Sequence, residues 1–227
     1  MRRLTALLLI LILPVLAEAA GPLVPADNDN STLDFSLRFA RTKMPLDYAG
    51  RTHDTTSRWF GFSLREQAGK RVTLGMYGGY AWLTQTNNPV TAGIELNGFH
   101  AGFSLHGVLL EGQRASLYGA LDYGYQKADH KSDTRTVVID WVQPQAQLGG
   151  ILTLARNWRL YGGGSYGKVD GEERASGSVN HTLSFERDAQ SGGFLGLDLN
   201  VEMDGYIGIE ARSGLMRGGE IYFKRRF

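Results

Sequence analysis

The stretch 72-VTLGMYGGYAW-82 decides the fold, because apolar and polar or small side chains alternate along it with a period of two. Such a period is typical of a β-strand whose two faces meet different surroundings. Its ten steps of roughly 3.3 Å, tilted by about 40°, rise roughly 25 Å, which is the height that a membrane-spanning strand needs. The apolar face carries Val72, Leu74, Met76, Tyr80 and Trp82.

The same alternation recurs along the chain and predicts ten strands. Their apolar faces lie within residues 33–39, 60–65, 72–82, 99–109, 117–125, 142–154, 158–166, 195–201, 207–212 and 221–227. Short polar turns (67–70, 111–114, 155–157, 202–205) alternate with longer connections (43–57, 85–91, 127–136, 171–190). Alternating connection lengths are typical of barrels that cross a membrane with antiparallel strands. An eight-stranded barrel is the alternative, if two segments form an outer hairpin.

The composition of the polar faces indicates which face meets lipid. These faces hold mostly Gly, Ser, Thr, Gln and Tyr, with few long charged side chains. This mixture suits a narrow interior better than a water-exposed surface. Because open strand edges in hydrocarbon would leave amide groups without partners, a lipid-facing sheet has to close. The sequence therefore predicts a closed all-β transmembrane barrel, in which the strand at 33–39 pairs with the strand that ends at Phe227.

Composition and the N-terminus exclude several other classes of protein. The 227 residues include 24 Lys and Arg, 23 Asp and Glu, and no Cys. Near-neutral charge argues against a nucleic-acid partner, and the lack of Cys excludes disulfides and thiolate metal sites. Residues 1–19 have a basic start, an apolar stretch at 4–16 and an Ala-Glu-Ala ending, which predicts a cleaved secretory signal. Residues 20–30 are expected to form an N-terminal periplasmic segment and residues 31–227 the barrel.

The signal, the amphipathic strands, the connection lengths and the terminal Phe227 resemble the small outer-membrane β-barrel proteins of Gram-negative bacteria, such as the OmpA, OmpX and opacity-type families. The resemblance implies an outer-membrane location in the cell envelope. It also implies that the last strand is the assembly signal read by the barrel-insertion machinery, with Ile221, Phe223 and Phe227 on one face. Arg225 and Tyr222 depart from that pattern, because the families usually have a hydrophobic residue and glycine there.

Two further sets of residues follow from the predicted faces. Mixed charges in a narrow lumen should pair, because an unpaired buried charge is costly. The expected lumen network contains Asp34, Arg38, Arg65, Asp122, Asp198, Glu210, Arg212, Lys224 and Arg226. Amphipathic rings favour both membrane interfaces. The expected aromatic girdles contain Trp59, Tyr80, Trp82, Trp141, Trp158 and Tyr166.

The sequence favours a non-enzymatic protein with a structural, adhesion or interaction role at the cell envelope. Its expected partners are outer-membrane lipid around the barrel and, at the loops, a host surface, another surface or envelope protein, or lipopolysaccharide. A narrow or gated pore for small solutes is one alternative, because Tyr and Arg side chains take up much of a backbone radius of roughly 10 Å and disfavour a wide channel. A surface hydrolase is another, because polar residues flank three loop histidines. These are His53 beside Asp54, His130 near Asp129 and Asp133, and His181 before Ser184 and Glu186. We expect no catalytic site, metal or cofactor, since His100 and His106 lie roughly 20 Å apart along one strand and no cofactor motif occurs.

Overall fold

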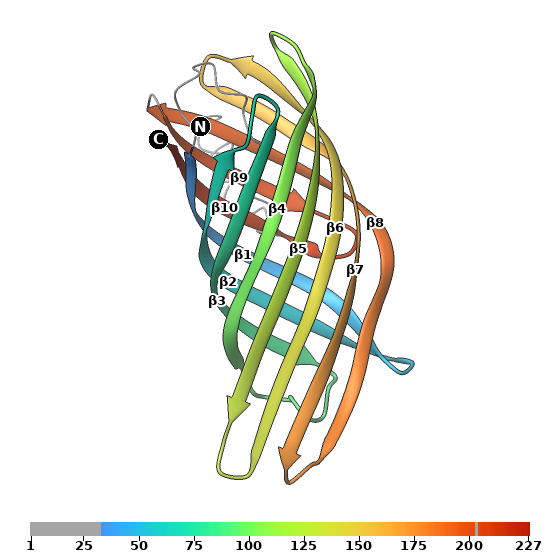
Figure 1. Ribbon diagram of the computed structural model, residues 1–227. Helices are drawn as coiled ribbons and strands as arrows, with labels where there is room; N and C mark the ends of the chain where they lie inside the picture. The colour runs from blue at the N-terminus through green and yellow to red at the C-terminus, as the bar shows by residue number, and fades with distance from the viewer. Residues whose placement is uncertain (1–32, 203) are drawn as a thin grey trace, which may run out of the picture.

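Ten antiparallel strands form a closed ring in the computed structural model, which describes residues 33–202 and 204–227 (Figure 1). The predicted signal peptide and N-terminal segment lie outside these residues. Each strand pairs with its neighbours in sequence, and β1 pairs with β10, so the ten-stranded closed barrel is confirmed. The strands are β1 (Leu33–Tyr48), β2 (Arg51–Gln67), β3 (Val72–Thr86), β4 (Leu96–Glu111), β5 (Ala115–Lys131), β6 (Arg135–Ala155), β7 (Trp158–Gly177), β8 (His181–Glu202), β9 (Gly205–Arg212) and β10 (Arg217–Arg226).

The barrel closes through a continuous ladder between β1 and β10. This ladder runs from Asp34 opposite Arg226 to Lys43 opposite Arg217. The pairing of the first and last strands, predicted from alternation alone, is therefore confirmed. Within the described residues, no helix is long and apolar enough to cross a membrane.

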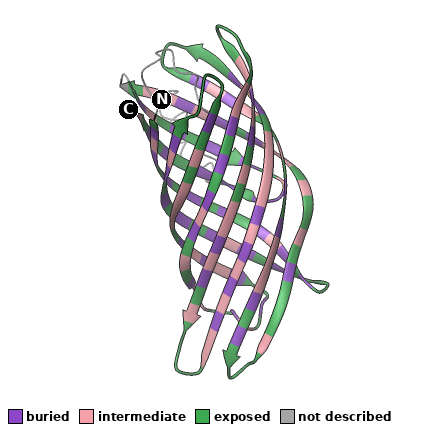
Figure 2. Ribbon diagram, viewed as in Figure 1, coloured by how far each residue is buried: buried purple, intermediate pink, exposed green. Residues whose placement is uncertain are grey.

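Buried and exposed residues alternate along the strands (Figure 2). The polarity of the inner and outer faces reverses partway along β1. In the first half of β1, Phe39 points outward and is 46% exposed, while Arg38 points inward and is buried. Four residues beyond Phe39, Lys43 is exposed, and Leu46 on the inner face has no exposed surface. Such a reversal is expected where the outer face passes from hydrocarbon to water, because the apolar side chains then belong inside.

The long connections predicted from the sequence are mostly strand, which corrects the expected loop bounds. β1 and β2 continue to a two-residue turn at Ala49 and Gly50, whose φ angles of 53° and 88° suit a tight hairpin. The segments at 127–136 and 171–190 likewise lie largely in β5 to β8. These strands extend far beyond the short β9 and β10, and we call this end of the barrel the hairpin end (Figure 1). Both described chain ends lie at the opposite, short-turn end.

The ring narrows at the hairpin end because β9 and β10 stop early. Beyond their connecting turn, β1 meets β8 through the bridge between Asp47 and Glu186. Arg187 ties this junction together, since its guanidinium donates to the carbonyl oxygens of Pro45 at 3.0 Å and Gly214 at 3.3 Å. The longer strands therefore continue beyond the ten-stranded ring at the hairpin end, where the Asp47–Glu186 bridge joins β1 to β8.

Candidate functional site

Ion pairs from several strands fill the lumen of the ten-stranded ring. Nε and Nη2 of Arg38 on β1 donate to the two carboxylate oxygens of Glu220 on β10 at 2.6 and 2.8 Å. Nε of Arg212 donates to Glu210 at 2.6 Å, and both residues lie on β9. All four side chains are buried. Bidentate and short contacts of this kind are the arrangement in which burial of two charges is best compensated.

A second cluster gathers around the buried carboxylate of Asp198 on β8. Asp198 accepts from Arg159 at 3.2 Å and from the hydroxyl of Tyr222, and Nζ of Lys224 lies 3.8 Å away. The hydroxyl groups of Tyr222 and Tyr161 are 3.0 Å apart. This network crosslinks strands β7, β8 and β10 through the interior.

All nine residues of the predicted lumen network point inward. Nearer the short-turn end, Arg226 donates to Asp34 at 2.9 Å, and Gln147 donates to Asp122 at 3.1 Å. The prediction omitted Glu220, although it shares the parity of Tyr222 and Lys224 on β10, because the strand was expected to begin at Ile221. The prediction also omitted Arg159 and Tyr222, which contact Asp198, and Tyr161, which contacts Tyr222. Strand parity places a side chain inside, whereas only the register across the barrel decides its partner.

Glycines make room for the two tyrosine rings of this network. A Cβ atom at Gly208 would overlap the ring of Tyr222, and one at Gly196 would overlap the ring of Tyr161. Gly208 stands directly opposite Tyr222 in the β9–β10 ladder. The absence of side chains at these two positions therefore allows both rings to lie flat against the inner wall.

Replacing Gly208 with alanine is expected to lower the free energy of unfolding by about 1 to 3 kcal/mol, because the Tyr222 ring has to move. Gly150→Ala is the matched control, since a Cβ atom there meets its nearest neighbour, the Ser116 carbonyl oxygen, at an ordinary 3.6 Å. Urea unfolding in lipid vesicles measures both. Equal losses for the two variants would contradict the steric argument.

Little space remains in the lumen. A cavity of about 40 Å³ lies among Arg38, Ser63, His106, Asp122 and Gln145, and a second of about 20 Å³ lies beside Tyr77 and His100. A buried water needs roughly 10 to 15 Å³, so the larger cavity holds only a few waters. Both nitrogens of His106 and the hydroxyl of Ser63 are buried without a protein partner, which suits bound water. These two cavities are each large enough for only one or a few waters.

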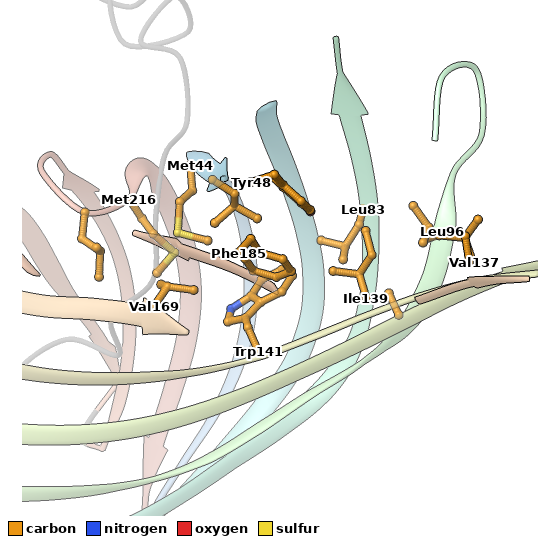
Figure 3. Close-up of a cluster of buried hydrophobic side chains, with 14 residues drawn as sticks. Met44, Tyr48, Leu83, Leu96, Val137, Ile139, Trp141, Val169, Phe185 and Met216 are labelled. Carbon is orange, nitrogen blue, oxygen red and sulfur yellow. The ribbon is translucent and has the colours of Figure 1, made fainter. Parts of the chain in front are cut away.

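An apolar cluster closes the interior at the hairpin end (Figure 3). The rings of Tyr48 and Phe185 lie 4.9 Å apart, and those of Trp141 and Phe185 lie 6.2 Å apart. The cluster draws on seven strands, β1 and β3 to β8, and on the β9–β10 turn. Its members are Met44, Leu46, Tyr48, Leu83, Leu96, Ala128, Val137, Ile139, Trp141, Val169, Ala175, Phe185, Leu215 and Met216.

The connection between β3 and β4, residues 87–95, folds onto this cluster. Val90 and Ile94 pack against it, and the buried side chain of Asn88 donates to Gln85 and to Glu173, each at 2.8 Å. The hydroxyl of Thr91 also donates to Gln85 at 2.8 Å. The segment thus caps the interior of the barrel at the hairpin end.

The three loop histidines have different surroundings. Nε2 of His181 lies 3.1 Å from the buried carboxylate of Glu173, and Nδ1 of His130 lies 3.2 Å from the carbonyl oxygen of Glu95. His53 packs edge-on against Tyr48. Ser184 stands opposite Glu172 on β7, whereas His181 stands opposite Ala175, so Ser184 and His181 occupy opposite faces of the hairpin. A histidine–carboxylate pair is present, but Ser184 is not aligned with it.

Two of the six predicted girdle residues are placed wrongly by the sequence analysis. Trp59 and Trp141 are buried inside the barrel, where the guanidinium of Arg38 lies 4.8 Å from the Trp59 ring and Trp141 joins the apolar cluster. The error came from reading aromatic character near a strand end as interfacial, although strand parity places both rings inward. The other four, Tyr80, Trp82, Trp158 and Tyr166, point outward.

The remaining predicted sites can be placed but not assigned a role. Ile221, Phe223 and Phe227 are exposed on the outer surface at the last strand, and their part in assembly stays a prediction. His100 and His106 are buried in the lumen. Among the residues described, no group of three or more His, Asp or Glu side chains could hold a metal ion.

Comparison with solved structures shows that the chain has the fold of outer-membrane β-barrels. A scan of family models and a search of curated proteins gave no match. The COG4313 outer membrane channel from Pseudomonas putida F1 is 11% identical with a TM-score of 0.52, over 92% of this chain and 100% of that one. The translocator domain of the autotransporter NalP from Neisseria meningitidis is 13% identical with a TM-score of 0.52, over 88% and 90%.

The β-domain of the Bordetella autotransporter BrkA is also similar, at 12% identity and a TM-score of 0.51 over 87% of this chain and 99% of that one. These neighbours support a location in the outer membrane. Because a channel and autotransporter domains share the fold, the likeness does not extend to one activity. Membership in the OmpA, OmpX or opacity-type families stays a prediction.

Proposed function

We propose that the protein is a non-enzymatic outer-membrane β-barrel that conducts no solutes and holds a rigid platform of β-hairpins for contact with a molecule outside the cell. The apolar cluster carries this proposal, because it fills the interior at the end where a channel would need an open mouth. Short turns and both chain ends lie together, as on the periplasmic side of such barrels. The hairpin end then faces the exterior.

The architecture of the hairpins supports a platform. The β1–β2, β5–β6 and β7–β8 hairpins end in tight turns at residues 49–50, 132–134 and 178–180. Their inner faces share one buried core, and their outer faces carry charged side chains such as Lys43, Asp129 and Arg174. A surface held by a packed core loses little conformational entropy on binding, which favours recognition.

Conductance in planar bilayers tests this proposal. We expect the purified protein to insert and to give no steady current above the baseline of the bare membrane, because both the lumen and the mouth are filled. Flotation of the protein with lipid vesicles checks insertion independently. Large, steady, ion-selective currents would reject the proposal in favour of the pore.

The contact between His181 and Glu173 favours a surface hydrolase as the second candidate. A carboxylate that holds an imidazole at 3.1 Å is one half of a general-base arrangement. Under our proposal, the protein leaves p-nitrophenyl butyrate and casein unhydrolysed. Hydrolysis that disappears in both His181→Gln and Glu173→Gln, with folding retained, would establish the second candidate instead.

A further inference from the structure

Four exposed cations gather on the outer wall where the apolar band ends. They lie on β1, β2 and β10, one or two outward positions beyond the apolar residues Phe39, Phe60 and Ile221. These three residues stand opposite one another in the ladders, so they form one apolar row across the wall. The cations are Arg41, Lys43, Arg58 and Arg217.

The register places these cations in like-charged pairs. Arg41 stands directly opposite Arg58, and Lys43 directly opposite Arg217. Opposed residues have Cβ atoms about 4.5 to 5.5 Å apart, and like charges at that distance destabilise a sheet. The two pairs share β1 and are only two residues apart along it. A polyanion bound across the patch would offset this repulsion.

Arg187 lies beside this group but stands opposite the buried Val169, so its strand parity is inward. Its guanidinium donates to the carbonyl oxygens of Pro45, two residues beyond Lys43, and of Gly214, three residues before Arg217. These contacts fix the guanidinium at the junction of β1, β8 and the β9–β10 turn. We call the four outward residues Arg41, Lys43, Arg58 and Arg217 the basic patch.

Carboxylates near the basic patch lie mainly on its side away from the membrane. Asp54 stands opposite Pro45, and Asp47 stands opposite Glu186, so all three are farther from the apolar row than Arg41. Glu95 pairs with Arg58. The order along the wall is therefore apolar residues, then cations, then carboxylates. This order places positive charge at the level of lipid headgroups.

The outer face of the barrel at β6 and β7 has a different charge pattern. On β6 and β7, Arg174 contacts Asp140 at 2.5 Å and Glu172 at 3.4 Å, and Lys168 contacts Asp170 at 2.5 Å. Cations there are neutralised within the protein. The opposed like charges on β6 to β8 are carboxylates, Asp140 with Glu172 and Asp170 with Glu186, whereas the opposed cations lie on β10, β1 and β2.

The apolar band is also short beneath the basic patch. On β2 it runs from Phe60 to Leu64, roughly 13 Å along the strand, and on β1 from Leu33 to Phe39, roughly 20 Å. On β3 it runs from Val72 to Trp82, roughly 33 Å. Where the apolar band is short, the bilayer thins locally, or long Lys and Arg side chains extend to reach the headgroups. Both responses bring lipid phosphates to Arg41, Lys43 and Arg58. Trp82 stands opposite Arg58 and adds a ring of the kind that favours the interface.

We propose that the basic patch binds the phosphate groups of a phosphorylated glycolipid headgroup, that of lipopolysaccharide, in the outer leaflet. The inference rests on the proposed orientation, in which the hairpin end faces the exterior. Two or more cations reach one phosphate from β1 and its neighbours, while the acyl chains lie along the row of Phe39, Phe60 and Ile221. Charge complementarity selects the phosphates, and the apolar row selects a lipid over a soluble anion.

Native mass spectrometry of the detergent-solubilised protein tests the inference with bisphosphorylated lipid A as the probe. The test variant combines Arg41→Gln, Lys43→Gln and Arg217→Gln, and leaves the Arg58–Glu95 pair and the Arg187 contacts in place. The matched control combines Arg51→Gln, Lys70→Gln and Lys131→Gln, which removes the same charge from exposed turns away from the patch. We expect binding to weaken about 10- to 100-fold in the test variant and to stay unchanged in the control.

Three further arms decide the source of the phosphate and the role of charge. Dephosphorylated lipid A should bind as weakly as the test variant binds lipid A, and inorganic phosphate should not compete at equal concentration. A variant with Arg41→Lys and Arg217→Lys should keep binding, since it keeps the charges. Equal binding by the test variant, equal binding of dephosphorylated lipid A, or full competition by inorganic phosphate would each overturn the inference. If the protein inserts into bilayers without conducting but shows no preference for phosphorylated lipid A, this inference is wrong while the proposed function stands.

Discussion

Replacing Glu220 with glutamine is expected to lower the free energy of unfolding by about 3 to 5 kcal/mol, the loss typical when one partner of a buried ion pair is removed. Glu220 has a fully buried side chain and accepts two hydrogen bonds from Arg38 at 2.6 and 2.8 Å. Glutamine keeps the volume but not the charge, so the guanidinium loses the carboxylate that compensates its burial. Urea unfolding in lipid vesicles, followed by tryptophan fluorescence, measures the loss.

Two variants separate charge from packing in this prediction. Glu172→Gln removes a carboxylate that contacts Arg174 at 3.4 Å on the outer wall, where both side chains are exposed, and should cost about 1 kcal/mol or less. The double variant Arg38→Met with Glu220→Met should recover most of the lost stability, because an apolar pair replaces the ion pair without leaving a charge behind. Wild-type stability in Glu220→Gln would contradict the view that this pair holds β1 to β10.

The part of the fold that lies beside lipid could be predicted from the sequence because the two faces of each strand meet different surroundings there. Hydrocarbon outside and polar groups inside produce the clear alternation seen from Val72 to Trp82. Closure followed from solvent alone, since no strand edge is stable in hydrocarbon. The ladder between β1 and β10 agrees with that reasoning.

Beyond the membrane the same reasoning ended the strands too early. After Phe39 the outward residues become Arg41 and Lys43, and the inward residues become Met44 and Leu46. A search for outward apolar residues stops detecting the strand at this reversal. The alternation itself continues, but the apolar residues now occupy the inward positions. Following the phase change would have predicted the hairpins and the apolar cluster.

The lumen shows a second limit of sequence reasoning. Parity placed Arg38 inside, but its partner Glu220 lies 182 positions away along the chain. Only the closing register between β1 and β10 brings the two side chains together. The same limit applies to the outer wall, where the like-charged pair of Arg41 and Arg58 is visible only once the hairpin register is known.

Replacing Leu46 with aspartate is expected to unpack the hairpin end while the membrane-spanning ring stays folded. Leu46 has no exposed surface and lies in the apolar cluster. A buried polar group without a hydrogen-bond partner costs about 2 to 7 kcal/mol, and an ionised carboxylate costs more. The long hairpins then open more often, so trypsin cleavage after the exposed residues Arg51 and Lys131 should accelerate on the order of 10- to 100-fold in vesicle-embedded protein.

Leu46→Met is the matched control, because it keeps volume and polarity and should leave the cleavage rate unchanged. Conductance of Leu46→Asp then tests whether the charged lumen blocks ions without the apolar cluster. The Arg38–Glu220 and Asp198 networks lie in the ring and do not depend on the apolar cluster, so the variant should remain silent in planar bilayers. Steady currents from this single substitution would mean that the apolar cluster is the sole barrier and that the charged lumen, once uncapped, is a channel.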